Sequence, residues 1–145
     1  TAGPNLEAIL GAHGSGAAAR SYKITAGMNV DMGGGTTKIA VVEKGKVIET
    51  MAINIGARLV AWDESDVLTR VEDAGRTIAN ALGIDVEVGV TLSNEDKERL
   101  ADKFAEIQFE AFTRSDYSDL AKDLTIHFRN QYRRARSVAL GTTGP

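Results

Sequence analysis

The sequence contains no cysteine, which excludes disulfide bonds and metal sites built from thiolates. This absence fits a reducing compartment but does not prove one. The expected location is the cytoplasm, and this expectation rests on other grounds. The sequence also has no excess of basic residues: 17 lysines and arginines stand against 20 aspartates and glutamates, giving a net charge of −3. The basic cluster at 133–136 is too small to change this balance. We therefore expect no nucleic-acid partner, because binding a phosphate backbone needs a sizeable basic surface.

Long apolar runs are absent as well. No stretch approaches the roughly 20 residues that a membrane span requires, so no membrane partner is expected. The 145 residues are 43% hydrophobic and 26% charged, which suits one globular domain. The sequence begins Thr-Ala-Gly-Pro without a methionine, and we expect it to be an excised piece of a longer protein.

The most informative stretch is residues 29–37, Asn-Val-Asp-Met-Gly-Gly-Gly-Thr-Thr. Without Cβ atoms, Gly33, Gly34 and Gly35 allow backbone N–H groups to point into one concavity that holds phosphate oxygens. Asp31 precedes them and can orient a hydrated Mg²⁺ ion. The pattern predicts a nucleotide-phosphate site. The alternative is an ordinary hairpin whose glycines only turn the chain, but a two-residue turn needs one or two glycines and no paired threonines.

The residues after the glycines distinguish this loop from two other phosphate loops. Walker loops and dinucleotide fingerprints both place the phosphate at the start of a helix. Here the β-branched run 37–43, the turn Lys44-Gly45 and a second such run at 47–54 predict strands instead. A phosphate grip in a β-hairpin resembles the second phosphate loop of actin-like, Hsp70-like and sugar-kinase-like ATPases.

This resemblance implies an α/β (α+β) fold, an actin-like ATPase (ribonuclease H-like) subdomain. We expect a three-stranded antiparallel meander plus one or more parallel strands, flanked by helices. A capping box at Ser93 predicts the start of the longest helix, and Gly83 suits the end of the preceding one. The expected strands are 28–32, 37–43, 47–54, 67–71 and 137–140, and the expected helices are 5–10, 17–19, 74–82, 93–112 and 118–124.

Several further segments resemble the reactivating factor of ethanolamine ammonia-lyase, the EutA family. They are Gly-Ser-Gly-Ala-Ala at 14–18, Asn-Ile-Gly-Ala-Arg-Leu at 54–59, and the segments 74–76, 82–84 and 118–121. The chain departs from the family pattern at Ala57, where a second glycine is usual. It also lacks the first phosphate loop and ends without the expected adenosine loop. Residues 1–145 therefore resemble a single lobe, the second of two.

The resemblance implies that ATP and Mg²⁺ bind between two lobes, and that the isolated lobe is inactive. The implied function is ATP-driven exchange of damaged adenosylcobalamin from ethanolamine ammonia-lyase, with that enzyme and the remaining lobe as partners. Asp31 is the expected catalytic residue and the ligand of a Mg²⁺-bound water. The residues expected to bind the nucleotide are Gly33, Gly34, Gly35, Thr36, Thr37 and Lys38.

Two of these interpretations have alternatives. Lys38 either adds charge near the phosphates or faces solvent, and strand alternation places it on the side of Ala40 and Val42, with its stem partly buried. Arg58 either ties the third strand to the nucleotide or forms a salt bridge with Asp63 or Asp66. For the whole chain, the other candidates are a lobe of a filament, pilus-assembly or cell-division protein, and a lobe of a hydantoinase or acetone carboxylase.

Overall fold

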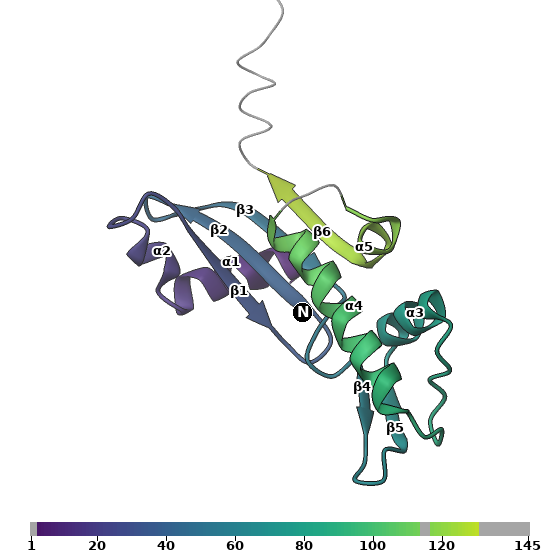
Figure 1. Cartoon of the computed structure of the whole chain (residues 1–145). Helices are drawn as coiled ribbons and strands as arrows, with labels where there is room; N and C mark the ends of the chain where they lie inside the picture. Colours follow the sequence, from purple (N-terminus) through teal and green to yellow (C-terminus); the bar gives the residue numbers. More distant parts are fainter. Residues whose placement is uncertain (1–2, 114–116, 131–145) are drawn as a thin grey trace, which may run out of the picture. The chain divides into compact units, whose positions relative to one another are not determined.

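The structure, a computed structural model, describes residues 3–113 and 117–130. Its described strands form a four-stranded sheet in the order β1-β2-β3-β6 and a separate two-stranded sheet of β4 and β5 (Figure 1). The helices are α1 (Pro4–Gly14), α2 (Ala17–Arg20), α3 (Asp73–Leu82), α4 (Asn94–Thr113) and α5 (Asp119–Leu124). The strands are β1 (Gly27–Met32), β2 (Thr37–Glu43), β3 (Lys46–Ile53), β4 (Val60–Trp62), β5 (Leu68–Val71) and β6 (Thr125–Asn130).

The chain folds into two compact units. Within the described residues, the first unit comprises 3–31, 38–52 and 126–130, and the second comprises 32–37 together with 53–113 and 117–125. The glycine loop lies in the second unit. The interpretation of residues 1–145 as one lobe of an actin-like ATPase stays a prediction.

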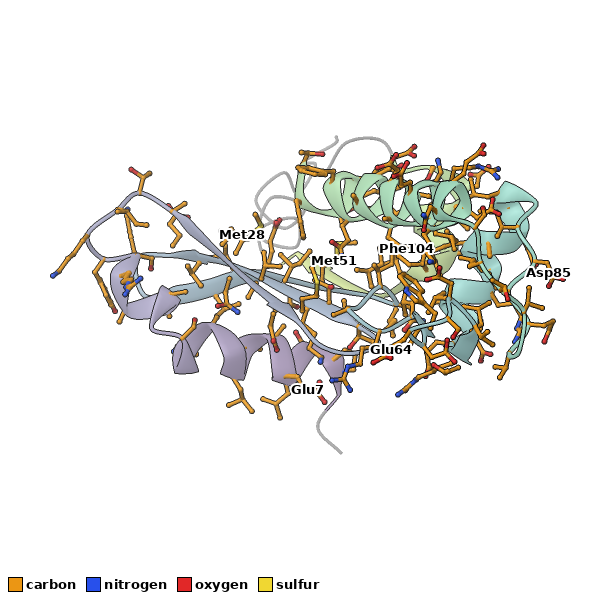
Figure 2. The ribbon with its side chains drawn as sticks, turned by 60° about the horizontal axis from the view of Figure 1, so that its bottom comes forward. Glu7, Met28, Met51, Glu64, Asp85 and Phe104 are labelled. Carbon is orange, nitrogen blue, oxygen red and sulfur yellow. The ribbon has the colours of Figure 1, made fainter. Side chains whose placement is uncertain are left out.

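In the first unit, α1 and α2 pack small side chains against the sheet. Ala8, Ala12 and Ala18 are buried in one cluster with Ala40 and Val42 of β2. Alanine lets the helices approach the strands closely, and each side chain loses little rotamer freedom on burial. Figure 1 shows the two purple helices beside β1, β2 and β3. Figure 2 shows Met28 on the side of the sheet away from α1, which carries Glu7.

The turn between β2 and β3 has two residues, Lys44 and Gly45, with φ of 47° and 78°. Positive φ at both central residues is the conformation that matches the twist of a tight hairpin. The Gly45 amide donates a 2.8 Å hydrogen bond to the hydroxyl of Ser21, so α2 and the turn are joined. A Cβ on Gly45 would lie 2.2 Å from the ring of Tyr22.

In the second unit, the helix boundaries follow the predicted local signals. Gly83 ends α3 in the left-handed conformation, with φ of 70°. Ser93 precedes α4, and its Oγ accepts a 3.1 Å hydrogen bond from the amide of Asp96. Leu100 and Ile107 lie two helical turns apart on one face of α4, and both are buried.

Some expectations differ from the structure. The described strands β1, β2, β3 and β6 run antiparallel, and the expected parallel strand stays a prediction. Strands β4 and β6 were not predicted, and the strand expected at 137–140 lies outside the described residues. The large aromatic side chains of Trp62 and Phe109 are 44% and 63% exposed. Trp62 ends a three-residue strand, and the ammonium of Lys97 lies 5.0 Å from the centre of its ring.

Candidate functional site

The glycine loop is closed on itself and tied to a second segment of the chain. The Gly33 amide donates to the Thr36 carbonyl at 2.8 Å. The Gly33 carbonyl accepts from the Ala57 amide at 2.9 Å, and the Gly34 carbonyl accepts from the Arg58 amide at 2.8 Å. In a trans peptide, the C=O of one residue and the N–H of the next point in opposite directions. The amides of residues 34 and 35 therefore point away from the segment that holds the loop.

These two amides are available to a ligand. No hydrogen-bond partner for the Gly34 or Gly35 amide is found within residues 3–113 and 117–130. Neither glycine has a positive φ, and a Cβ added to either would meet no atom within 4 Å. Neither the backbone conformation nor the surrounding protein therefore requires glycine at these positions. Close approach of a ligand to the backbone is the remaining physical reason for a missing side chain.

The two threonines that follow the glycines differ in their surroundings. Thr37 is fully buried, and its Oγ1 donates a 2.6 Å hydrogen bond to the Ile55 carbonyl. The same oxygen accepts a long contact of 3.5 Å from the Gln108 amide. Thr36 is partly exposed, and its hydroxyl has no partner in the described part of the chain. Only Thr36 presents a hydroxyl that a ligand could use without breaking an existing bond.

A cavity of about 280 Å³ lies beside the loop within the second unit. Glu72 and Asp73, at the start of α3, contribute to this cavity, and the Glu72 carboxylate is paired with Arg70. The outward amides of the loop suit phosphate oxygens. The lining of the cavity consists of Gly35, Thr36, Asn54, Leu59, Glu72, Asp73 and Ala74.

Asp31 and Lys38, the predicted residues on either side of the loop, lie in the first unit. Asp31 is exposed and contributes to a cavity of about 320 Å³ with Ser15 and Asn29. The Ser15 hydroxyl donates to Asn29 Oδ1 at 2.6 Å. Lys38 Nζ forms an ion pair with Glu7 Oε2 at 3.1 Å, and only 17% of its side chain is exposed. The predicted partial burial of the Lys38 stem is confirmed, and its contact with phosphate stays a prediction.

Within the described ranges, no three His, Asp or Glu side chains gather as a metal site. Mg²⁺ usually binds through one or two carboxylates, several waters and substrate phosphates. An exposed Asp31 could meet that requirement through a water.

Sequence reasoning missed the position of Gly56. A Cβ on Gly56 would lie 2.5 Å from the Gly34 carbonyl oxygen and 2.6 Å from that of Gly33. The Asn-Ile-Gly-Ala-Arg-Leu pattern was recognised as familial, but its place beneath the loop depends on tertiary contact. The predicted salt bridge of Arg58 is not found among the described residues: Asp66 pairs with Lys97 instead.

Comparison with known proteins agrees with this geometry. Residues 1–142 match the family described as "Ethanolamine utilisation protein EutA". The chain belongs to the EutA family. Two EutA relatives carry the name "Ethanolamine ammonia-lyase reactivase EutA". The Salmonella typhimurium protein is 35% identical over 79 residues, 54% of this chain and 17% of the relative. The Escherichia coli protein is 33% identical over 81 residues, 55% of this chain and 17% of the relative.

A further relative is the cell division protein FtsA of Agrobacterium fabrum, 50% identical over 48 residues, 32% of this chain and 11% of that protein. This match agrees with the actin-like superfamily indicated by the glycine hairpin. No solved structure matches the chain. The EutA-family chain spans about a sixth of the length of the reactivases that it matches. Among its described helices, none combines the length and apolar character needed to cross a membrane.

Proposed function

We propose that this chain is an ATP-binding lobe of a reactivase that acts on ethanolamine ammonia-lyase. The observation that carries the proposal is the pair of outward-pointing amides at Gly34 and Gly35. Neither amide has a partner among residues 3–113 and 117–130, and a Cβ added to either glycine would meet none of their atoms within 4 Å. The EutA family match and the reactivase names of two relatives support the choice of partner.

The residues of the loop divide into ligands and supports. The amides of Gly34 and Gly35 and the hydroxyl of Thr36 would hold phosphate oxygens of ATP. Asp31, two residues before the glycines, would orient a water of the bound Mg²⁺. Gly33 and Thr37 keep the turn in shape through their own hydrogen bonds.

Lys38 is expected to contribute less to ATP binding than the loop residues. It follows the loop directly in the sequence, but its ammonium is paired with Glu7. We assign it a contribution of positive charge and no direct phosphate contact.

In this proposal a second lobe supplies the other half of the phosphate grip. ATP hydrolysis provides free energy, and the partner enzyme's damaged adenosylcobalamin is exchanged while the lobes change position. The cytoplasm is the proposed location. Because half the contacts would be missing, the isolated chain should bind ATP weakly and hydrolyse it negligibly. Robust turnover by the 145-residue chain alone would overturn the two-lobe account.

The decisive experiment uses the full-length parent protein. It is mixed with cobalamin-inactivated ethanolamine ammonia-lyase, free adenosylcobalamin, ATP and Mg²⁺, and deamination of ethanolamine is followed. We expect activity to return with ATP and to stay absent when ATP is omitted. No return of activity with the intact parent protein would overturn the proposed function.

A second candidate function rests on the FtsA match over 48 residues. In that case nucleotide binding would control assembly of the parent protein into polymers. Sedimentation of the parent protein with and without MgATP separates the two candidates: ATP-dependent pelleting without reactivation of the lyase favours assembly.

A further inference from the structure

We infer that Thr37 and residues 55–58 are positioning elements that aim the Gly34 and Gly35 amides at the bound phosphate. The inference rests on the proposed function, because the phosphate is the ligand being positioned. It assigns the two adjacent threonines different tasks: Thr36 contacts the ligand, and Thr37 acts through the backbone of another segment.

Three hydrogen bonds join the loop to this segment. Thr37 Oγ1 donates to the Ile55 carbonyl at 2.6 Å, and the Ala57 amide donates to the Gly33 carbonyl at 2.9 Å. The Arg58 amide donates to the Gly34 carbonyl at 2.8 Å. Together they fix the planes of the two peptides that carry the outward amides. Without them each peptide could rotate, and its N–H would no longer have one direction.

Glycine at position 56 makes this approach possible. Its φ is not positive, so the backbone conformation does not require glycine there. A Cβ would instead lie 2.5 Å from the Gly34 carbonyl oxygen, a separation that real Cβ atoms essentially never show. The neighbouring atoms are backbone and cannot rotate away as a side chain could. Glycine is therefore required for contact with the loop.

Helix α3 supports the same segment from its other end. The Leu59 carbonyl accepts a 2.8 Å hydrogen bond from the Glu72 amide, directly before α3 begins. A Cβ on Gly75 would lie 2.7 Å from the same carbonyl oxygen, so the first turn of α3 packs closely against Leu59. Residues 55–59 are thus bonded to the loop at one end and to α3 at the other. A segment held at both ends can set the loop's geometry before a ligand arrives.

The test compares Thr37→Val, Thr37→Ser and Thr36→Val in the full-length parent protein. Valine keeps the shape of threonine but cannot donate to the Ile55 carbonyl, whereas serine can. Amide hydrogen exchange of a peptide covering residues 33–37 is measured without nucleotide, and the MgATP dissociation constant is measured by calorimetry. Circular dichroism and thermal unfolding confirm that each variant is folded.

We expect Thr37→Val to raise loop exchange without nucleotide several-fold. It should weaken MgATP binding about tenfold, because a loop amide that is no longer aimed at the phosphate loses a hydrogen bond to a charged group. Thr37→Ser keeps the hydroxyl, so its loop exchange and its MgATP dissociation constant should both stay close to those of the wild type. Thr36→Val should weaken MgATP binding while leaving the exchange of the empty loop unchanged, because its hydroxyl is not used within the protein.

Unchanged loop exchange and unchanged MgATP affinity in folded Thr37→Val would overturn the inference. Should that variant not fold, Gly56→Ala is measured in the same way, and unchanged values there would overturn it equally. If the wild-type protein binds no MgATP, the proposed function fails, and exchange of the empty loop still decides whether Thr37 and residues 55–58 hold the loop in place.

Discussion

The two turns at either end of β2 both contain glycine, and they use it for different purposes. At the turn Lys44-Gly45, Gly45 has φ of 78°, a conformation that L side chains rarely adopt. At the turn 33–36, Gly34 and Gly35 have no positive φ and no neighbour that a Cβ would touch. Glycine is needed for backbone conformation in the first case and for access to the backbone in the second.

This difference between the two turns shows how the reason for a glycine can be identified from a structure. A count of glycines in the sequence does not distinguish the two turns, whereas φ and the space above the Cα atom do. The comparison gives predictions in which catalysis, binding and stability respond separately, and each can be measured on the full-length parent protein.

The largest effect is expected for Asp31→Ala, on the strand that enters the glycine loop. MgATP hydrolysis should fall at least about 100-fold if Asp31 orients the metal-bound water that takes part in the reaction. The fold should stay intact, because Asp31 is exposed. Phosphate release and circular dichroism measure the two quantities. Lys46→Ala, an exposed change beside the other turn, is the matched control. Unchanged turnover in Asp31→Ala would remove this residue from the site.

Gly35→Ala should separate binding from stability. A methyl group there meets no atom of the described residues within 4 Å, so the free energy of unfolding should change by less than about 0.5 kcal/mol. It would occupy the space through which a phosphate approaches, and the MgATP dissociation constant should rise about tenfold, equivalent to about 1.4 kcal/mol. Calorimetry and urea unfolding test both halves. A tight MgATP complex in this variant would show that the space over Gly35 is not the phosphate site.

Gly45→Ala should give the opposite pattern. Its positive φ and the nearby Tyr22 ring predict a loss of about 1–2 kcal/mol in the free energy of unfolding. The exposed Tyr22 ring can move, which keeps the cost from being larger. The MgATP dissociation constant should stay within about twofold of wild type, since no binding contact is removed. Weaker binding without a loss of stability would contradict the division between the two turns.

The smallest effect is expected for Lys38→Met. Its pair with Glu7 is partly exposed, so its removal should cost less than about 1 kcal/mol of stability. MgATP affinity should fall only two- to threefold, roughly the loss of a weak charge effect without a direct contact. Glu7→Gln serves as the control for the ion pair itself. A loss of affinity as large as that in Gly35→Ala would show that Lys38 leaves Glu7 and reaches the phosphate.

Much of the fold could be predicted because its signals are local. Strand β2 has the predicted bounds, 37–43, and α3 and α4 begin and end within about one residue of their predicted positions. Capping at Ser93 and the left-handed Gly83 depend only on neighbours within a few residues. The strand that follows the glycine loop was likewise readable from the β-branched run at 37–43.

The roles within the site depend on distant contacts and could not be predicted in the same way. Thr36 and Thr37 are identical side chains in the sequence, and only the Ile55 carbonyl, 18 residues away, separates them. The pairing of Lys38 with Glu7 joins β2 to α1 and has no local signal. Gly56 belongs to a segment that resembles the family, but the reason for glycine at this position is its close contact with the backbone of the loop, which the sequence does not show.

The ring of Trp62 beneath the Lys97 ammonium also has a practical consequence. It is the only tryptophan in the chain, so emission excited at the red edge of protein absorbance arises from this indole alone. The β4–β5 hairpin therefore carries an intrinsic optical reporter that needs no attached dye. A shift in its emission maximum or lifetime when MgATP is added would record, in real time, a rearrangement reaching the hairpin.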